Sequence, residues 1–193
     1  MFSEVRQGRL SLKNRFIRSA IWEEQADDQG HLNPNLIQNY VTLAENQVAL
    51  LITGGIAVSE QDWPLRQMLS LHQDQYIPEH QELTQKVHEQ KAQIWAQLTL
   101  GGNNIYQSFR KKAPTDYSQE EIKDLTSAFA QAAQRAEMAG YDGIQIQAAH
   151  GLLISRFLSP KENRREDKYG GDNRLRFLQE IFVHFLHHTD NQL

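Results

Sequence analysis

The sequence predicts an α/β fold built on a parallel sheet, and two observations lead to that prediction. Short apolar runs alternate four times with segments of helical period along the 193 residues. Runs such as Val48–Ile52 are apolar on both faces, as strands buried between two layers are. Such strand–helix alternation is typical of a parallel sheet with right-handed crossovers. Because no linker or low-complexity tract divides the chain, we expect a single domain over residues 1–193.

The expected strands are short and evenly spread. They lie at Arg15–Ser19, Val48–Thr53, Ile94–Leu98 and Gly143–Gln147. The second reads Val-Ala-Leu-Leu-Ile-Thr, a pattern that fits a buried parallel strand. A small hairpin that turns at Gln7-Gly8 is expected before the first strand, where it would plug the amino-terminal end of a barrel.

Four helices are expected between and after these strands. Asn33 followed by Pro34 is a helix start, because asparagine caps well and proline fits the first turn. Ser118 and Glu121 form a capping box for the third helix, which Gly140 would stop. The expected buried stripes are Leu36, Ile37, Tyr40, Val41 and Ala44; Ile77, Leu83 and Val87; Ile122, Leu125, Phe129, Ala132 and Ala136; and Leu175, Leu178, Ile181, Phe182 and Phe185.

The composition excludes several classes of protein. The formal net charge is -4, so the sequence lacks the excess of basic residues that is typical of nucleic-acid-binding proteins. There is no cysteine, which rules out disulfides, thiolate nucleophiles and cysteine metal sites. No apolar window is long enough to span a membrane, and the first residues lack a signal-peptide core. We therefore expect a cytoplasmic protein without a nucleic-acid or membrane partner.

Two polar or small motifs follow the central strands. The phosphate-binding patterns Gly-x-Gly-x-x-Gly and Gly-x-x-x-x-Gly-Lys-Ser/Thr are missing. Thr53-Gly54-Gly55 would let a flat ligand approach the backbone, or would form only a tight turn. Gln97 lies near the end of the third strand, where its carboxamide suits the edge of a heterocycle or a bond to neighbouring backbone.

Three other groups of polar residues are candidates for a functional role, and the sequence supports them to different degrees. Gln147 and His150 follow the fourth strand, and an imidazole there can donate to a carbonyl or a developing oxyanion, although a lone histidine is more often structural. His184, His187 and His188 have helical spacing, but a solvated helix end explains them better than a metal site. The mixed-charge segment Asn163–Lys168 favours a salt-bridged lid.

Residues 142–171 resemble the Old Yellow Enzyme family of FMN-dependent NAD(P)H:flavin oxidoreductases. The matching run is Asp-Gly-Ile-Gln-Ile-Gln-Ala-Ala-His-Gly, then Phe-Leu-Ser-Pro, Asn-Arg-Arg and Tyr-Gly-Gly. The stretches LSLKNRFIRSAIWE, ALLITGGIAVS and IWAQLTLGG resemble the family's first three strands. The resemblance covers essentially the whole chain, and it corresponds to the amino-terminal half of the family's fold.

The resemblance implies a fold, a reaction and a set of site residues. The fold is a TIM barrel, of which about four of the eight βα units are present as a half-barrel. The family reduces FMN with NADH or NADPH and passes hydride to a small-molecule acceptor such as an activated alkene. By resemblance, Ser19, Ala20 and Ile21 lie beside the flavin ring. Gly55 approaches the ring, Gln97 binds its pyrimidine edge, and Gln147 with the catalytic His150 holds the substrate.

The chain departs from the family at three positions near the site. Gln147 replaces the first pocket histidine, so it can donate a hydrogen bond without carrying charge. Leu152 stands where the family has a tyrosine proton donor. Trp22 stands where many members have a threonine or cysteine that tunes the flavin.

A four-unit chain leaves two strand edges and a sheet face uncovered, and it lacks strands 7 and 8, whose loops commonly bind phosphate. We therefore expect a truncated or split member that binds FMN weakly and self-associates or pairs with a complementing chain. The alternative hypothesis is a non-catalytic half-barrel, a remnant or interaction module that requires a partner chain.

Overall fold

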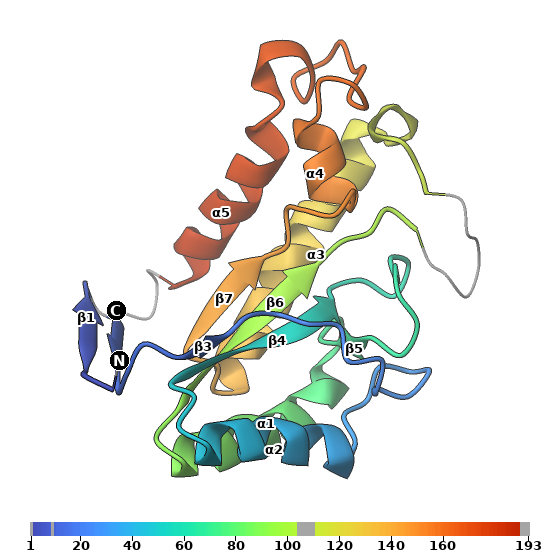
Figure 1. The fold of residues 1–193 in the computed structure, drawn as a ribbon. Coiled ribbons are helices and arrows are strands. Elements are labelled where there is room, and N and C mark those ends of the chain that lie inside the picture. Colours follow the sequence, from blue (N-terminus) through green and yellow to red (C-terminus); the bar gives the residue numbers. More distant parts are fainter. Residues whose placement is uncertain (1, 9, 104–110, 190–193) are drawn as a thin grey trace.

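The fold is a parallel sheet with helices on one face (Figure 1). A computed structural model describes residues 2–8, 10–103 and 111–189. The strands, in spatial order, are β3 (Ile17–Arg18), β4 (Leu50–Ala57), β6 (Gln93–Thr99) and β7 (Gly143–Ile146), with β5 (Leu69–Ser70) beside the end of β4. All of these pairs are parallel. The four strands expected from the sequence are confirmed, and β5 is an addition.

The helices follow the strands in the expected alternation. They are α1 (Pro34–Glu45), α2 (Ile77–Glu89), α3 (Gln119–Met138), α4 (Leu153–Leu158) and α5 (Arg176–Thr189), with 3₁₀ turns at Asp74–Tyr76, Pro114–Asp116 and Gly171–Asn173. The short helix α4 was not expected, because six residues are too few to show a helical period. Among the described residues, no helix has the length and apolar character needed to cross a bilayer.

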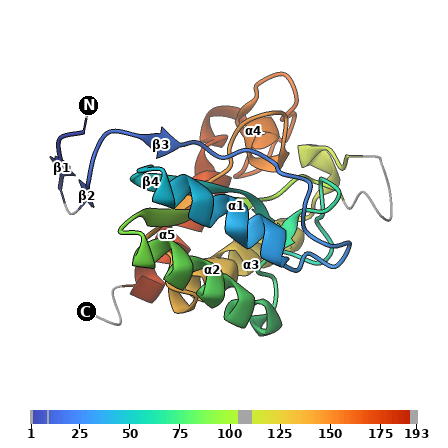
Figure 2. The ribbon, with the colours of Figure 1, turned by 60° about the horizontal axis from the view of Figure 1, so that its bottom comes forward.

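The main hydrophobic core fills the space between the sheet and the helices. Helices α1 and α2 lie side by side on one face of the sheet (Figure 2). A smaller cluster on the opposite face joins Leu50 and Ile52 of β4 to Leu12. Leu12 belongs to the hairpin of β1 (Val5–Gln7) and β2 (Leu10–Leu12), which confirms the expected hairpin. The two faces of the sheet are therefore distinct, a helix-covered outer face and an inner face.

The helix boundaries match their local signals. The Asn33 side chain accepts a hydrogen bond from the Leu36 amide at 3.0 Å, as an N-cap does. Ser118 and Glu121 each accept a hydrogen bond from the other's amide, so the expected capping box is confirmed. After α3 ends, Gly140 has a φ of +83°, a conformation that favours glycine.

A buried histidine ties β5 to the start of β7. The Ser70 carbonyl lies 3.2 Å from His80 Nε2 and can only accept, so Nε2 carries the proton. Nδ1 then accepts from the Tyr141 hydroxyl at 2.7 Å. Burial lowers the pKa of His80 to about 4, which keeps the imidazole neutral.

The buried stripe expected for the last helix is wrong in part. Phe177 and Ile181 are the buried residues, whereas Phe182 is 48% exposed and Leu175 is 54% exposed and precedes the helix. Helix α5 packs on α3 and α4, with the Phe177 ring 4.8 Å from that of Phe157. The face that carries Phe182 is turned toward an apolar groove beside β7.

This groove is an apolar hollow at the edge of the core. It has a volume of about 380 Å³ and opens between β7, α3 and α5. Its lining is Trp95, Phe129, Ala130, Ala133, Ile144, Gln145, Ile146, Ala148, Leu178, Ile181, Phe182 and Phe185. In the part of the chain that the structure describes, β7 pairs with β6 alone. The outer edge of β7 and the groove therefore form one uncovered surface.

The capping box of α3 provides a test of the fold. Replacing Ser118 by alanine leaves the Glu121 amide without its acceptor, so Ser118→Ala should lower the free energy of unfolding by about 1 kcal/mol. Ser127→Ala is the matched control, because Ser127 is exposed on the same helix and should change stability by less than about 0.5 kcal/mol. Urea denaturation measures both. Equal stability of the two variants would contradict this assignment.

Candidate functional site

The candidate site lies on the inner face of the sheet, at the carboxyl ends of its strands. Parallel pairing sets Gly55 of β4 opposite Gln97 of β6, and Gln97 opposite Gln145 of β7. Residues two apart in a strand share a face, so Trp95, Gln97 and Thr99 line the inner side of β6. Ligands of open and closed parallel α/β sheets bind at this end.

Three glutamine side chains meet there in a hydrogen-bonded cluster. Gln97 Nε2 donates to Gln145 Oε1 at 2.6 Å, and Gln147 Nε2 approaches Gln97 Oε1 at 3.4 Å. Gln97 is 8% exposed, and its backbone amide donates to Thr53 Oγ1 at 3.0 Å. The structure thus brings the expected Gln97 and Gln147 together. Gln145 was missed, although its position between Gly143 and Gln147 in the strand period signals the same face.

The glycine pair belongs to the strand rather than to a turn. Strand β4 continues to Ala57, with a shift in its pairing to β6 between Ile52 and Gly55. The tight-turn interpretation of Gly54-Gly55 is therefore wrong, because the irregular pairing lets the strand continue. A Cβ on Gly55 would lie 2.7 Å from both Met68 Cε and Thr99 Oγ1, so a larger residue would force these side chains to shift.

The segment after β3 crosses the end of β4. Ser19, Ala20 and Ile21 have no regular secondary structure, and Ile21 is 58% exposed. A Cβ on Gly54 would lie 2.7 Å from the Ile21 carbonyl oxygen, so this backbone rests directly on the glycine. The expected residues Ser19–Ile21 and Gly55 are thus on adjoining stretches of backbone at the same end of the sheet.

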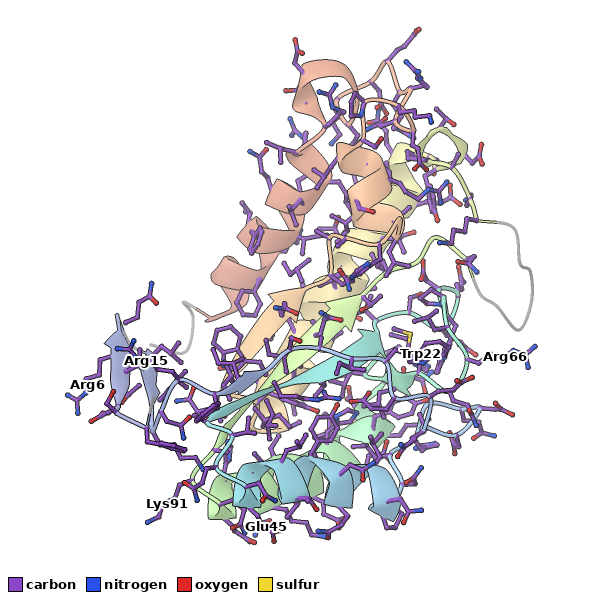
Figure 3. All side chains as sticks on the ribbon, viewed as in Figure 1. Arg6, Arg15, Trp22, Glu45, Arg66 and Lys91 are labelled. Atoms are coloured by element: carbon purple, nitrogen blue, oxygen red, sulfur yellow. The ribbon has the colours of Figure 1, made fainter. Side chains whose placement is uncertain are left out.

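Trp22 follows this segment and anchors it to a neighbouring loop. Its Nε1 donates to the Arg66 carbonyl at 3.0 Å, which fixes the indole against the loop between β4 and β5. Figure 3 shows Trp22 and Arg66 at one end of the sheet and Arg6, Arg15 and Lys91 toward the other. A tryptophan anchored in this way contributes a large apolar surface to the rim of the site and has no thiol or hydroxyl to offer.

His150 lies at the rim and is separate from the amide cluster. It is exposed and has a φ of +58°, a conformation that is uncommon outside glycine. Among the described residues, no hydrogen bond links it to Gln97 or Gln147. Gln147 Oε1 accepts from the Ala149 amide at 3.0 Å, which connects the cluster to the turn that presents His150. An exposed imidazole at this turn is accessible to a ligand placed over the strand ends.

Leu152 points away from solvent. It is buried and serves as the residue before α4, with its amide donating to the Ala149 carbonyl at 3.1 Å. It therefore supplies neither a proton nor a polar contact to the site. Of the expected segment 163–168, Arg165 pairs with Asp167 at 2.5 Å and donates to the Pro114 carbonyl, which confirms the salt bridge but does not test a lid.

Asp62 is a buried acidic residue that supports the loops after β4 and β6, and the sequence did not indicate it. Its carboxylate is buried and accepts from the amides of Gly101 at 2.5 Å and Gly102 at 2.7 Å. It thereby holds the loop after β4 against the end of β6. Burial raises the pKa of Asp62 to about 6, and the two amides oppose that rise. In the sequence, the only sign of this role is an acidic residue beside Trp63-Pro64, and that signal is too weak to identify Asp62.

Among the described residues, no group of three histidine, cysteine or acidic side chains is placed to hold a metal ion. His184 Nδ1 lies 2.9 Å from the Glu180 carbonyl of its own helix. The side chains of His187 and His188 lie outside the described ones.

Comparison with known proteins gives a consistent picture. Residues 1–188 match the model of the NADH:flavin oxidoreductase / NADH oxidase family. The chain is 36% identical to an NADPH dehydrogenase of Bacillus subtilis over 196 residues, which are 94% of this chain and 58% of that protein. It is 34% identical to an NADH oxidase of Thermoanaerobacter brockii, of which it covers 31%.

Solved structures agree in fold. The Old Yellow Enzyme of a Pichia species superposes with a TM-score of 0.89 at 23% identity, over 96% of this chain and 56% of that one. A homologue from Zymomonas mobilis superposes with a TM-score of 0.84 at 24% identity, over 96% and 59%. The four βα units are therefore those of a partial TIM barrel, as the resemblance implied, and the chain spans little more than half the length of these proteins.

The buried Asp62 predicts a pH dependence of stability. Its folded pKa of about 6 lies above that of an unfolded aspartate, so the folded state holds this proton more tightly. Between pH 4 and 7 the wild type should lose about 1–3 kcal/mol of stability relative to Asp62→Asn, which has no charge to bury. Urea denaturation at both ends of this range measures the difference.

Asp124→Asn, at an exposed position of α3, controls for the introduction of an asparagine. A difference between wild type and Asp62→Asn that stays constant across the range would contradict the burial argument.

Proposed function

Because the chain belongs to the NADH:flavin oxidoreductase / NADH oxidase family, we propose that it binds FMN across the carboxyl ends of its strands. The reductant is NADH or NADPH, and the final acceptor is a small molecule such as an activated alkene. FMN, when bound, supplies the capacity for hydride transfer. The observation that supports this proposal most is the glutamine cluster on β6 and β7.

The cluster fits the polar edge of a flavin. A carboxamide offers both a donor and an acceptor, which the pyrimidine edge of the ring requires. Gln97 is buried and held by Gln145, so its carboxamide is fixed in direction before a ligand arrives. A fixed donor and acceptor bind better than free ones, because less side-chain entropy is lost on binding.

The backbone on either side fits a flat ring. Gly54 and Gly55 keep side chains off the end of β4, and Ser19–Ile21 pass directly over Gly54. Thr99 Oγ1 is buried near Gly55 and has no hydrogen-bond partner among the described residues. A ligand with a polar edge at this position would satisfy such a group.

Gln147 and His150 are proposed to hold the substrate. Gln147 Oε1 accepts from the Ala149 amide, and Nε2 approaches Gln97 with one of its two hydrogens, which leaves the second hydrogen to donate to a substrate. The exposed imidazole of His150 can donate to a substrate carbonyl and polarise it. Because Leu152 is buried and apolar, the proton that completes alkene reduction would come from solvent, which makes that step slow.

We propose that the four βα units alone bind FMN with low affinity. Phosphate sites of TIM barrels are frequently built by loops after strands 7 and 8, which are not among the units described here. Charge-assisted hydrogen bonds to the phosphate are each worth roughly 1.5–3 kcal/mol, so lacking them would weaken the binding of FMN.

The cytoplasmic localisation expected from the sequence stays a prediction.

A second function is favoured by the uncovered edge of β7. A strand edge and an apolar groove that lie together are a surface on which further strands and helices can pack. The alternative is therefore a half-barrel interaction module that pairs with a second copy or a complementing chain. This role does not require catalysis, and it is compatible with FMN binding.

The flavin proposal predicts a loss of affinity in Gln97→Leu. Removing the donor and acceptor at the pyrimidine edge should weaken FMN binding about tenfold or more. Gln93→Leu is the matched control, because Gln93 lies on the same face of β6 at its other end and donates to Ser11. Quenching of FMN fluorescence measures both. Equal affinity of the two variants, or no quenching by the wild type up to the solubility limit of FMN, would contradict the proposal.

The interaction proposal predicts association through the groove. The wild type should form larger species as its concentration rises, and Phe182→Glu should suppress them, because Phe182 lines the groove. Leu175→Glu is the control, since Leu175 has a similar exposure and does not line the groove. Sedimentation velocity over a range of concentrations measures the distribution. A wild type that stays monomeric over the whole range of concentrations, both alone and mixed with a complementing chain, would exclude this role.

A further inference from the structure

A largely buried ion pair joins the two ends of the segment that crosses the end of β4. Arg18 Nη2 contacts Glu23 Oε1 at 2.6 Å, and the two side chains are only 15% and 13% exposed. Arg18 also donates to the Ile52 carbonyl at 2.9 Å. Separating the two side chains would leave a largely buried charge without its partner, which is costly, so the pair resists opening.

Tyr40 of α1 completes the arrangement. Its hydroxyl donates to Glu23 Oε1 at 2.5 Å and accepts from the Gly54 amide at 3.0 Å. The Arg18 guanidinium lies 5.0 Å from the centre of the Tyr40 ring, within cation–π range. One buried hydroxyl thus connects the loop residue Glu23 to the backbone of β4.

The geometry of the segment depends on these contacts. Residues 19–23 have no strand partner of their own, because β3 ends at Arg18. Glu23 is the point at which side-chain bonds fix the far end of the segment. Between Arg18 and Glu23 the backbone rests on Gly54, close to Ile21. The spacing between Ser19–Ile21 and the glycines of β4 is therefore set by Arg18, Glu23 and Tyr40.

We propose that Arg18, Glu23 and Tyr40 are positioning residues that hold the segment Ser19–Trp22 in the conformation to which the flavin binds. This inference rests on the proposed FMN site and adds to it residues that lie on the helix side of the sheet. Their side chains act on the ligand through the backbone of the segment and of Gly54. Binding is tighter when such a segment is ordered in advance, because less ordering is needed on association.

The test compares Glu23→Gln and Tyr40→Phe with wild type. Both variants should bind FMN about tenfold more weakly, the change that corresponds to losing one charge-assisted hydrogen bond. In flavin-free protein, amide hydrogen exchange in residues 19–24 should become faster, while exchange in α3 stays unchanged. The absorption spectrum of bound flavin should also shift, because the backbone beside the ring is no longer fixed.

Glu24→Gln is the matched control, since Glu24 is the exposed neighbour of Glu23 in the same segment. It should leave FMN affinity, exchange and spectrum as in wild type. Should Glu23→Gln fail to fold, Tyr40→Phe decides alone, because it removes a single oxygen. Unchanged exchange in residues 19–24 of the variants would overturn the positioning role. A wild type that takes up no FMN would contradict the proposed function instead, and the exchange data would still decide the conformational claim.

Discussion

The register among β4, β6 and β7 is the constraint on which the rest of the structure depends. It sets Gly55, Gln97 and Gln145 side by side across three parallel strands. Since side chains alternate between faces, the same register sends the neighbouring aliphatic residues into the core beneath the helices. A slip of one residue would exchange the polar cluster for apolar side chains, so core packing and site geometry are fixed together.

Local signals predicted the elements well, and long-range contacts account for what the sequence did not reveal. Asn33 and Ser118 act within one helical turn, so their caps could be predicted. Asp62 contacts amides 39 and 40 residues further along, and no local pattern records such a contact. The stripe of the last helix was wrong only in part: Ile181 is buried and Leu178 and Phe185 pack on the core, whereas Leu175 and Phe182 are exposed, because helical period alone does not fix the edges of the buried face. Packing against Phe157 selects the face that carries Phe177.

The segment at the strand ends and the open edge of β7 lie in different parts of the sheet and depend on different contacts. The segment after β3 is fixed by a largely buried hydrogen-bond network around Glu23, although it has no strand partner. Strand β7 has full pairing on one side and an apolar groove on the other. The features expected to contact a flavin ring are thus well held, while the surface beside β7 is open to further elements. The two proposals, flavin binding at the strand ends and association through the groove, can therefore be tested independently.

The most direct test of the central claim locates the flavin on the amide cluster. Nuclear magnetic resonance of protein labelled with ¹⁵N at glutamine reports each side-chain amide separately. On adding FMN, the resonances of Gln97, Gln145 and Gln147 should shift together, while that of Gln93 at the far end of β6 should not. Shifts confined to other glutamines, or no shift with FMN in excess, would contradict a flavin site at the strand ends.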